Sequence, residues 1–596
     1  MRTHTLPGTE FDDLAAGYGS PAGVAALRAA QFSRRLLLLR EILRVARSPR
    51  LDDAFALLTY AQEGAPRSVA ETVTAPQFGA WVAAAYRAAR TDGGARHPAL
   101  GALSAIAVAA AVRAGCEFTF DVPVTGGRVV LPGLGRAAAG DAVVTVVGKA
   151  GEYRVGDVTI PPDPAADAPG WTGLRHLRST VDGCAVTVTL DDLDPYRDEH
   201  GLHASDRLGP ADVRRWQRLL DDAWPILVRH HRRYAEAIGA GLVTIVPLRP
   251  PGSGRSVNGT SMHAFGAVSL SPPRDDLALA SSLLHEFQHA KLGALLDLVP
   301  LYADDGGHRH YAPWRDDPRP LGGLLQGVYA FLGVTDFWRT ERGLLEGAKA
   351  HFAHEEFARW RHLVGRALRT LEESDRFTAD GRRFLAGMRA TLSSFAADTV
   401  PADAATIAAA TAEDHWVGWR LRNLRPDPDQ VRLVRAAWLA GAAQPPRAVD
   451  TAVVPGDVRA RDDSARLDLA LLRLADPARF GGACAQPSEL VRVVPAATPG
   501  DAAYVNGDLA AAVAAYRAQI DADPDDRRGW VGLALAAGRL GGPDAVVWRT
   551  GPELPYAVHR AVRDAGQPAP DPVALARWLA RAPGRTGHVG GGSTTQ

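Results

Sequence analysis

The chain has 596 residues, more than a single hydrophobic core usually holds, so we expect two to four domains. Its 46% hydrophobic and 22% charged residues are typical of a soluble globular protein. Lysine plus arginine number 67 and aspartate plus glutamate also number 67, which excludes a strong overall field that would attract nucleic acid or an anionic membrane. The partner must therefore be recognised by a local site.

The cysteines and the N-terminus indicate where the protein works. Cys116, Cys184 and Cys484 are far apart, so they predict neither a disulfide framework nor a Cys-x-x-Cys metal site, and a reducing cytoplasm fits best. The first residues lack the basic head and apolar run of a signal peptide, and no apolar stretch is long enough to span a bilayer. We expect a cytoplasmic protein without a membrane partner.

Residues 1–115 are predicted to form an N-terminal helical region. Apolar residues recur at helical spacing in Ala22–Arg47 and Gln77–Arg90, each with an arginine-rich outer face. The alanine-rich stretch Pro98–Val112 is too short to cross a membrane and is predicted to be a buried helix. No catalytic motif is visible in this region.

Residues 116–205 are predicted to form a β-rich module, because β-branched residues alternate with other residues between glycine and proline turns. The end of this module is dense in charge and could make a polar site. The residues concerned are His176, Asp191, Asp192, Asp194 and His200. We expect instead that these side chains lie in solvated loops at the ends of strands.

Residues 206–425 are predicted to be the catalytic domain. A helical stretch, Gly209–Ala240, is followed by a buried strand at 242–248 and by a second strand within 261–273 that contains His263. His263 is a candidate extra metal ligand, although a lone histidine is more often structural. A strand that ends directly before the next helix would place that helix at the edge of a sheet.

The next helix, predicted within Ser281–Pro300, carries the motif H-E-x-x-H. His285 and His289 are four residues apart, so they project from one helix face and can hold one divalent metal ion. Glu286 follows the first histidine and can act on a bound water. A chance match in a chain with 18 histidines has a probability of about one or two per cent. The alternative is a pair of hydrogen-bonded core histidines.

The sequence after this helix bears on the kind of metal site. A zinc peptidase needs a third ligand, which is a glutamate on a second helix in one class and a histidine in a short extension of the motif in another. The short extension is absent, and Gly293 comes one position late for it. The predicted second helix, Leu321–Trp338, contains no glutamate and offers Gln326 where a ligand is expected. These departures weaken the prediction of a peptidase.

Between the two helices lies a proline-stiffened loop with Tyr311, Trp314, Arg315 and Arg319. An arginine binds a carboxylate through two parallel hydrogen bonds, so this loop could clamp a dicarboxylate whose other end chelates the metal. Two histidines plus one further ligand, with open positions, is the pattern of non-haem iron oxygenases. Alternatively, the arginines pair with nearby aspartates, for which the candidates are Asp304, Asp305, Asp316 and Asp317.

These segments resemble the HExxH-type peptide β-hydroxylases that use 2-oxoglutarate, which occur in actinobacterial clusters for ribosomally made, modified peptides. The resemblance is carried by three segments that cover, with their flanking helices, roughly a quarter of the chain. They are FGAVSLSPP, HEFQHAKLGALLDL and YAPWRDDPRPLGGLLQGVYAFLGVTDFWR. The resemblance implies iron- and 2-oxoglutarate-dependent β-hydroxylation of a side chain in a precursor peptide, with other peptide-maturation enzymes as further partners.

The resemblance also assigns residues. It implies that His285 and His289 bind Fe(II), and that the loop Tyr311–Arg319 binds 2-oxoglutarate, with Arg315 preferred over Arg319 as the clamp. Relatives fused to radical enzymes have a histidine near the place of Gln326, so the identity of the third ligand stays open. The candidates are Gln326, His308 and His310, in that order.

The rest of the chain is predicted to be mainly helical. Residues 426–500 form a connecting region in which crowded prolines indicate loops or a boundary. Residues 501–580 resemble a tetratricopeptide helical hairpin, and residues 581–596 are too rich in glycine and serine to order. The predicted fold is therefore mostly helical α+β, with a central HExxH metal-binding helix, a β-rich insert and a helical-repeat end.

Two other functions fit the motif. In a zinc peptidase, Glu286 would polarise water for attack on an amide. In a peptide-binding scaffold without catalysis, the metal would be structural and the helical repeat would bind the partner.

Overall fold

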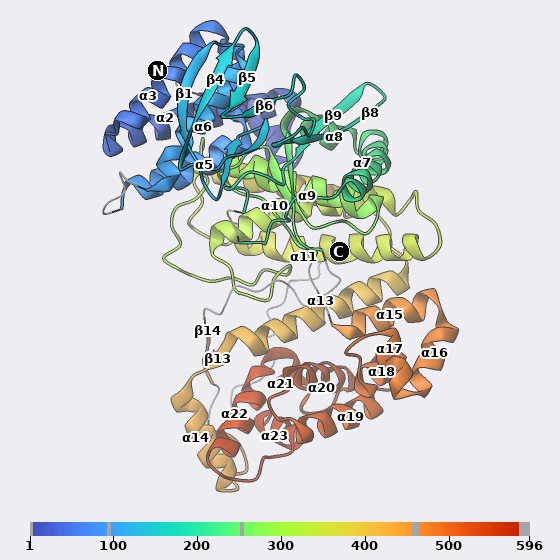
Figure 1. The fold of residues 1–596 in the computed structure, drawn as a ribbon. Coiled ribbons are helices and arrows are strands. Elements are labelled where there is room, and N and C mark those ends of the chain that lie inside the picture. The colour runs from blue at the N-terminus through green and yellow to red at the C-terminus, as the bar shows by residue number, and fades with distance from the viewer. Residues whose placement is uncertain are drawn as a thin grey trace. The chain divides into compact units, whose positions relative to one another are not determined.

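The computed structural model describes residues 4–91, 97–198, 201–250, 256–446, 449–454 and 464–582. These residues form a mostly helical α+β protein, as predicted (Figure 1). They divide into two compact units, and each is described by itself. The first contains residues 1–303, 329–337 and 376–394, and the second contains residues 304–328, 338–375 and 395–596. Within the described residues, no helix combines the length and apolar composition needed to cross a membrane.

Most helices of the first unit begin with proline, which lacks an N–H group and has a φ angle suited to the first helical position. They are α1 (Gly8–Ala15), α2 (Pro21–Ala46), α3 (Pro49–Gly64), α4 (Pro66–Thr74), α5 (Pro76–Ala89), α6 (Pro98–Arg113), α7 (Pro210–His230), α8 (Arg232–Gly241), α9 (Asp276–Leu296) and α12 (Ala379–Ser394). The alanine-rich stretch is the buried helix α6, which confirms that prediction. The middle of α10 (Leu321–Glu341) also belongs to this unit.

Twelve strands of the first unit form three sheets within the described residues. The strands are β1 (Phe118–Pro123), β2 (Arg128–Leu131), β3 (Gly135–Ala138), β4 (Val143–Lys149), β5 (Glu152–Val155), β6 (Val158–Ile160), β7 (Trp171–Gly173), β8 (Arg175–Val181), β9 (Cys184–Leu190), β10 (Thr244–Pro247), β11 (Asn258–Gly259) and β12 (Ala267–Leu270). The sheet orders are β1-β4-β5-β6, β2-β3-β7 and β11-β12-β10-β9-β8. In the five-stranded sheet, β10 pairs in parallel with β9 and β12, and the outer pairs are antiparallel.

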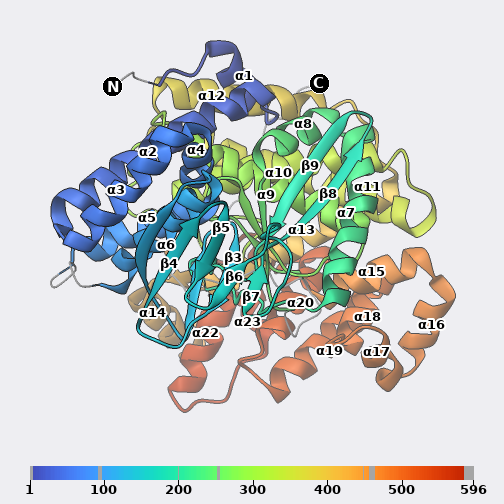
Figure 2. The ribbon, with the colours of Figure 1, turned by 45° about the horizontal axis from the view of Figure 1, so that its top comes forward.

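The helices α2 to α6 and the strands β1 to β7 bury one continuous hydrophobic core. Helix α6 packs on β1 and β2, and Figure 2 shows it beside β4. The five-stranded sheet is covered by other helices, since α7 packs on β8, α8 on β9 and α9 on β11 and β12. The metal-motif helix α9 therefore lies at the β11 edge of a sheet, as the sequence predicts.

The second unit is almost entirely helical. Its helices are α11 (Gly347–Glu372), α13 (Ala402–Asn423), α14 (Pro428–Leu439), α15 (Ala465–Ala475), α16 (Pro477–Ala485), α17 (Pro487–Val493), α18 (Pro499–Asn506), α19 (Leu509–Ala522), α20 (Arg527–Leu540), α21 (Ala545–Thr550), α22 (Glu553–Asp564) and α23 (Pro572–Leu579). Two short strands, β13 (Leu424–Pro426) and β14 (Thr451–Val453), pair with each other. Neighbouring helices α18 to α20 pack pairwise around Tyr516 and Trp530.

Prolines expected to mark loops after residue 425 partly start helices instead. Pro428 is the first residue of α14, and the preceding Asp427 caps this helix by accepting hydrogen bonds from Asp429 and Gln430. A proline at the first helical position loses no hydrogen bond, so Pro428 starts this helix without disturbing it. Residues 583–596 of the predicted tail lie outside the described residues.

The three aspartates after β9 are buried, which corrects the expectation of solvated loops. Asp191, Asp192 and Asp194 are each no more than 2% exposed. Asp191 accepts hydrogen bonds from the backbone of residues 193 and 194 and from Gln77 Nε2, at 2.7 Å, on α5. His176 lies exposed on β8, and His200 is outside the described residues.

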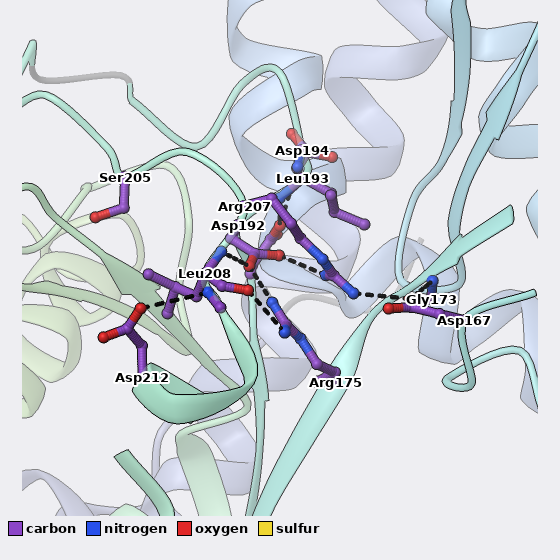
Figure 3. Close-up of polar contacts among 12 residues, drawn as sticks. Asp167, Gly173, Arg175, Asp192, Leu193, Asp194, Ser205, Arg207, Leu208 and Asp212 are labelled. Carbon is purple, nitrogen blue, oxygen red and sulfur yellow. Dashed lines mark hydrogen bonds and ion pairs between the residues drawn. The ribbon is translucent and has the colours of Figure 1, made fainter. Parts of the chain in front are cut away.

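Asp192 is the centre of a buried ion-pair network (Figure 3). Arg175 pairs with one of its carboxylate oxygens, and Arg207 Nη1 lies 2.9 Å from the other. Arg207 Nη2 also lies 2.9 Å from Asp167, which accepts a hydrogen bond from the backbone of Gly173. The network joins β7, β8 and the loop after β9, so it holds the β-rich segment to the five-stranded sheet.

Asp194 lines a small cavity on the face of the five-stranded sheet that carries Thr244 and Val246. The cavity has a volume of about 30 Å³, enough for one or two waters, and α5 closes it with Gln77. Burial, followed by the nearby Asp191 carboxylate, raises the pKa of Asp194 to about 7. The Asp194 carboxylate accepts a hydrogen bond from the backbone of Tyr196 at 2.8 Å.

Candidate metal site

Helix α9 is buried on nearly every side and opens along one stripe. Asp275 caps its N-terminus by accepting a hydrogen bond from Ala278 N at 2.8 Å. Most of its side chains are buried, which explains why it is apolar almost all round. Ser282, His285 and His289 are half-buried and lie three and four residues apart, so they share the accessible stripe.

The imidazoles of His285 and His289 converge. Their Nε2 atoms are 3.2 Å apart, and the ring planes are inclined by 78°. This separation is short enough for one metal ion to bind both nitrogens at an ordinary metal–nitrogen distance of about 2.1 Å. Burial, followed by the charge of His289, holds the pKa of His285 well below its usual value. His285 is therefore neutral, which is the form that binds a metal.

Glu286 is buried beside the histidine pair. It is 3% exposed, and its Oε1 lies 3.9 Å from His285 Nε2. Its Oε2 accepts a hydrogen bond from Thr260 Oγ1 at 2.7 Å. Burial raises the pKa of Glu286 to about 7, although the Thr260 hydrogen bond acts in the opposite direction. The carboxyl group is thus held in place next to the pair and can keep a proton near neutral pH.

The segment Asn258–Met262 runs along the open stripe of α9. Asn258 donates to Ser282 Oγ at 3.0 Å, and Thr260 follows with its hydrogen bond to Glu286. Further along, Met262 packs on Gly293, where an added Cβ would come within 2.9 Å of the sulfur. This contact accounts for Gly293. The same segment forms one wall of the site.

His263 is not in a strand, which corrects that expectation. It lies in the bend between β11 and β12, and β12 begins only at Ala267. The opposite wall includes Phe331, whose ring meets that of His285 edge to face at a centroid distance of 4.8 Å. Phe331 lies in the part of α10 that belongs to the first unit.

The other side of α9 anchors the beginning of the chain. Gln288 Nε2 donates to the carbonyl of Gly17 at 2.7 Å, and Lys291 Nζ donates to the carbonyl of Tyr18. Burial lowers the pKa of Lys291 to about 7, and its ammonium also lies 5.9 Å from the ring centroid of Tyr234. The sequence gives no local signal for this contact, because its partners are far apart along the chain.

The arginines of the predicted clamp loop belong to the second unit and share one acid. Arg315 Nε donates to Asp317 at 2.7 Å, and Arg319 Nη1 donates to its other oxygen at 3.1 Å. Asp317 is 4% exposed, so both guanidinium groups are fixed by a buried carboxylate. Both arginines therefore pair with a nearby aspartate, as the alternative prediction states.

The loop packs against two glycines on one face of α10. The indole of Trp314 lies against Gly327, where an added Cβ would be 2.1 Å from the ring. The guanidinium of Arg319 lies over Gly323, where an added Cβ would be 3.1 Å from Arg319 Nε. Because Gly323 and Gly327 are four residues apart, they form one smooth strip. Gln326, the first candidate for the third ligand, is half-buried beside this strip.

Tyr311 anchors the start of the same loop to α13. Its hydroxyl lies 2.8 Å from His415 Nδ1, and His415 Nε2 lies 3.4 Å from Asp316. The guanidinium of Arg366 stacks on the ring of Tyr311 at 4.8 Å. Asp316 is also bound by Arg422. Tyr311 is therefore fixed within a polar and aromatic cluster of the second unit.

His308 and His310, the other candidates for the third ligand, both lie near Asp305. His308 Nδ1 is 2.5 Å from the carbonyl of Asp305, and His310 Nε2 is 3.7 Å from its carboxylate. Burial lowers the pKa of His310. Within the described part of the chain, no group of three or more His, Cys, Asp and Glu side chains is arranged to hold a metal ion.

The donor set at α9 nevertheless fits a divalent metal that binds nitrogen. Two imidazoles converge on an accessible stripe with their Nε2 atoms 3.2 Å apart, a distance that suits two ligands of one metal ion as well as a hydrogen bond between the rings, and a carboxyl group stands beside them. Asn258, Thr260 and Phe331 fix the surroundings of this pair.

Comparison with known proteins adds no assignment. No protein-family model matches the chain, and a search of curated proteins finds no match.

Proposed function

We propose that the protein is a non-haem iron enzyme that uses 2-oxoglutarate to β-hydroxylate a side chain of a ribosomally synthesised precursor peptide. The observation that supports this proposal best is the 3.2 Å approach of the His285 and His289 Nε2 atoms on an accessible stripe. Bound Fe(II) would supply dioxygen-dependent oxidation of an unactivated carbon–hydrogen bond. In this proposal the two histidines hold the metal, and 2-oxoglutarate and dioxygen are further ligands.

The sparse ligand set favours an oxygenase. A structural zinc site uses four protein ligands and a catalytic zinc site usually three. No third His, Cys, Asp or Glu joins the pair within the described residues. A site with two strong protein ligands suits a chelating cosubstrate that fills the remaining positions.

The other residues have positioning roles in this proposal. Glu286, held by Thr260, keeps a proton beside the pair rather than competing as a charged ligand. Arg315 is the proposed partner of the distal carboxylate of 2-oxoglutarate, and Asp317 fixes its guanidinium group through Nε. Arg319 and Tyr311 hold the loop in shape.

The central test measures metal binding and cosubstrate turnover separately. Anaerobic titration with Fe(II), followed by 2-oxoglutarate, should give one iron per chain and a visible charge-transfer absorption in the wild type. His285→Ala should lose both, whereas His230→Ala, which removes an exposed histidine at the end of α7, should keep both. With oxygen and the precursor peptide, succinate and a peptide 16 Da heavier should form in equal amounts. Iron binding that survives His285→Ala would overturn the proposal.

A clamp variant tests the cosubstrate assignment. Arg315→Lys keeps the charge but loses the planar pair of donors, so we expect a higher 2-oxoglutarate requirement with unchanged iron binding. Arg309→Lys, a replacement in the same segment, is the matched control. If Arg315→Lys and Arg315→Ala both leave the 2-oxoglutarate requirement unchanged, the clamp is another cation, with Arg319 as the next candidate.

A zinc peptidase is the second candidate, and the position of Glu286 favours it. A carboxyl group 3.9 Å from a ligand nitrogen, with a pKa of about 7, could serve as the base for a metal-bound water. Tightly held zinc, peptide cleavage that stops in Glu286→Gln, and no succinate formation would establish this function instead.

A non-catalytic scaffold is the third candidate. The helices α19 and α20 resemble a tetratricopeptide hairpin, which suits peptide binding. An unchanged peptide mass under iron, 2-oxoglutarate and oxygen, together with peptide binding that survives His285→Ala, would favour it.

A further inference from the structure

The second unit contains a cavity of about 430 Å³ between α13, α15, α18 and α20. We call it the α13–α15 cavity. Its volume is in the range of pockets that bind small molecules or anchor side chains. Its apolar lining residues are Ile407, Ala410, Leu467, Ala470, Leu474 and Val505. Moving an aliphatic side chain from water into this apolar lining would be favourable.

The polar side chains at the floor of this cavity already have hydrogen-bond partners in the protein. Arg466 is 7% exposed and is gripped by Asp414, whose oxygens lie 2.7 and 2.9 Å from its Nε and Nη2 atoms. Its Nη1 lies 2.6 Å from Asp501, which also accepts a hydrogen bond from Tyr516. The floor is therefore rigid and polar, and Arg466 has no charge to offer a ligand.

The mouth of the cavity carries two exposed arginines. Arg473 donates to the carbonyl of Val505, and the guanidinium carbon of Arg539 lies 5.1 Å from the ring centroid of Tyr504. Neither of these partners neutralises the charge of its arginine. Besides Asp414 and Asp501, which Arg466 binds, the acids nearby are Asp403, exposed on the rim, and Glu413, whose pKa burial raises. The mouth thus offers two guanidinium groups to a carboxylate next to an apolar pocket.

We propose that the α13–α15 cavity binds a peptide segment in which an aliphatic side chain is followed closely by an acidic one. The aliphatic side chain fills the space beside Ala470, and the carboxylate meets Arg473 and Arg539. Building on the proposed function, this segment belongs to the precursor peptide and lies outside the residue that is modified. The cavity then gives affinity and selectivity for the peptide, while the α9 site acts on a different part of it.

The test uses a random 12-residue peptide display library against the immobilised full chain. We expect enriched peptides to combine an aliphatic residue with an aspartate or glutamate within a few positions. The enriched peptide should bind at least 10-fold more weakly to Arg473→Glu/Arg539→Glu. Arg432→Glu/Arg492→Glu changes the same charge at exposed positions outside the cavity and should bind like the wild type.

A second variant separates the cavity from simple charge attraction. Ala470→Trp fills the apolar space without changing charge, so it should also weaken binding at least 10-fold, with circular dichroism and the melting temperature checking its fold. Enriched peptides without acidic residues, or binding that is unaffected by Ala470→Trp, would overturn the inference. Binding should persist in His285→Ala, so a failed iron chemistry with retained binding would refute the proposed function and leave the cavity assignment standing.

Discussion

The buried carboxyl group of Asp194 should make the stability of the protein fall as the pH rises. Asp194 has a pKa of about 7 in the folded chain, against 3.8 for an ordinary aspartate. Among the described residues that line its cavity, the charged neighbours of Asp194 are the acid Asp191 and the cation Arg197. Between these two pKa values, the folded state keeps a proton that the unfolded state releases. Folding stability therefore decreases with rising pH in this window.

The size of this effect follows from the two pKa values. Each pKa unit corresponds to about 1.4 kcal/mol, so ionisation of Asp194 costs on the order of 4 kcal/mol at pH 8. At pH 5 the cost is on the order of 2 kcal/mol, since most of the titration window lies above this pH. Asp194→Asn keeps an acceptor for the Tyr196 amide and removes the ionisation. The variant should therefore be more stable than the wild type, by a margin that widens by about 2 kcal/mol from pH 5 to pH 8.

Thermal unfolding followed by circular dichroism at pH 5, 6, 7 and 8, at constant ionic strength, measures this margin. At about 2 °C per kcal/mol, the gap in melting temperature should widen by about 4 °C. Asp157→Asn, which removes a fully exposed carboxylate from the same unit, is the matched control. A gap that stays constant, or a variant less stable than the wild type at pH 8, would show that Asp194 is ionised and stabilising, and would refute the reasoning.

Two further predictions concern contacts around the candidate site. Thr260→Val should lower the stability of the metal-free protein by about 1–3 kcal/mol, because it leaves the buried Glu286 carboxyl without its hydroxyl partner, and Thr260→Ser should restore most of the loss in urea unfolding. Gly327→Ala should lower the melting temperature by forcing the Trp314 indole away, although alanine favours a helix by about 1 kcal/mol. Gly418→Ala is the control, since its Cβ would make only an ordinary contact at 3.8 Å, and an equal effect of both replacements would contradict the packing argument.

The histidine pair was predictable because its geometry is local. Any helix through His285 and His289 places them one turn apart, so the motif and its apolar surroundings suffice. The place of α9 at a sheet edge was also predictable from the strand that precedes it. The pairing of Arg315 with Asp317, two residues away, was one of the alternatives that the sequence left open.

What the sequence could not predict depends on partners far along the chain. Asp192 looks like a loop residue until Arg175 and Arg207 surround it, and Asp191 is buried under Gln77, 114 residues away. A charge-rich segment with this composition is usually solvated, so composition alone wrongly predicts exposed aspartates here. The hydrogen bond from Thr260 to Glu286 likewise cannot be predicted from the spacing of apolar residues.

The hydrogen bonds from α9 to the beginning of the chain also set an order for biosynthesis. Gly17 and Lys291 are 274 residues apart, so at about 5–20 residues per second the N-terminal segment waits on the order of 10–60 s for its partner to be made. The first unit also includes residues 376–394, so it is complete only after translation has passed Ser394. Until then, the apolar faces of its early helices lack their final partners, and this is the interval in which the emerging chain is most prone to aggregate.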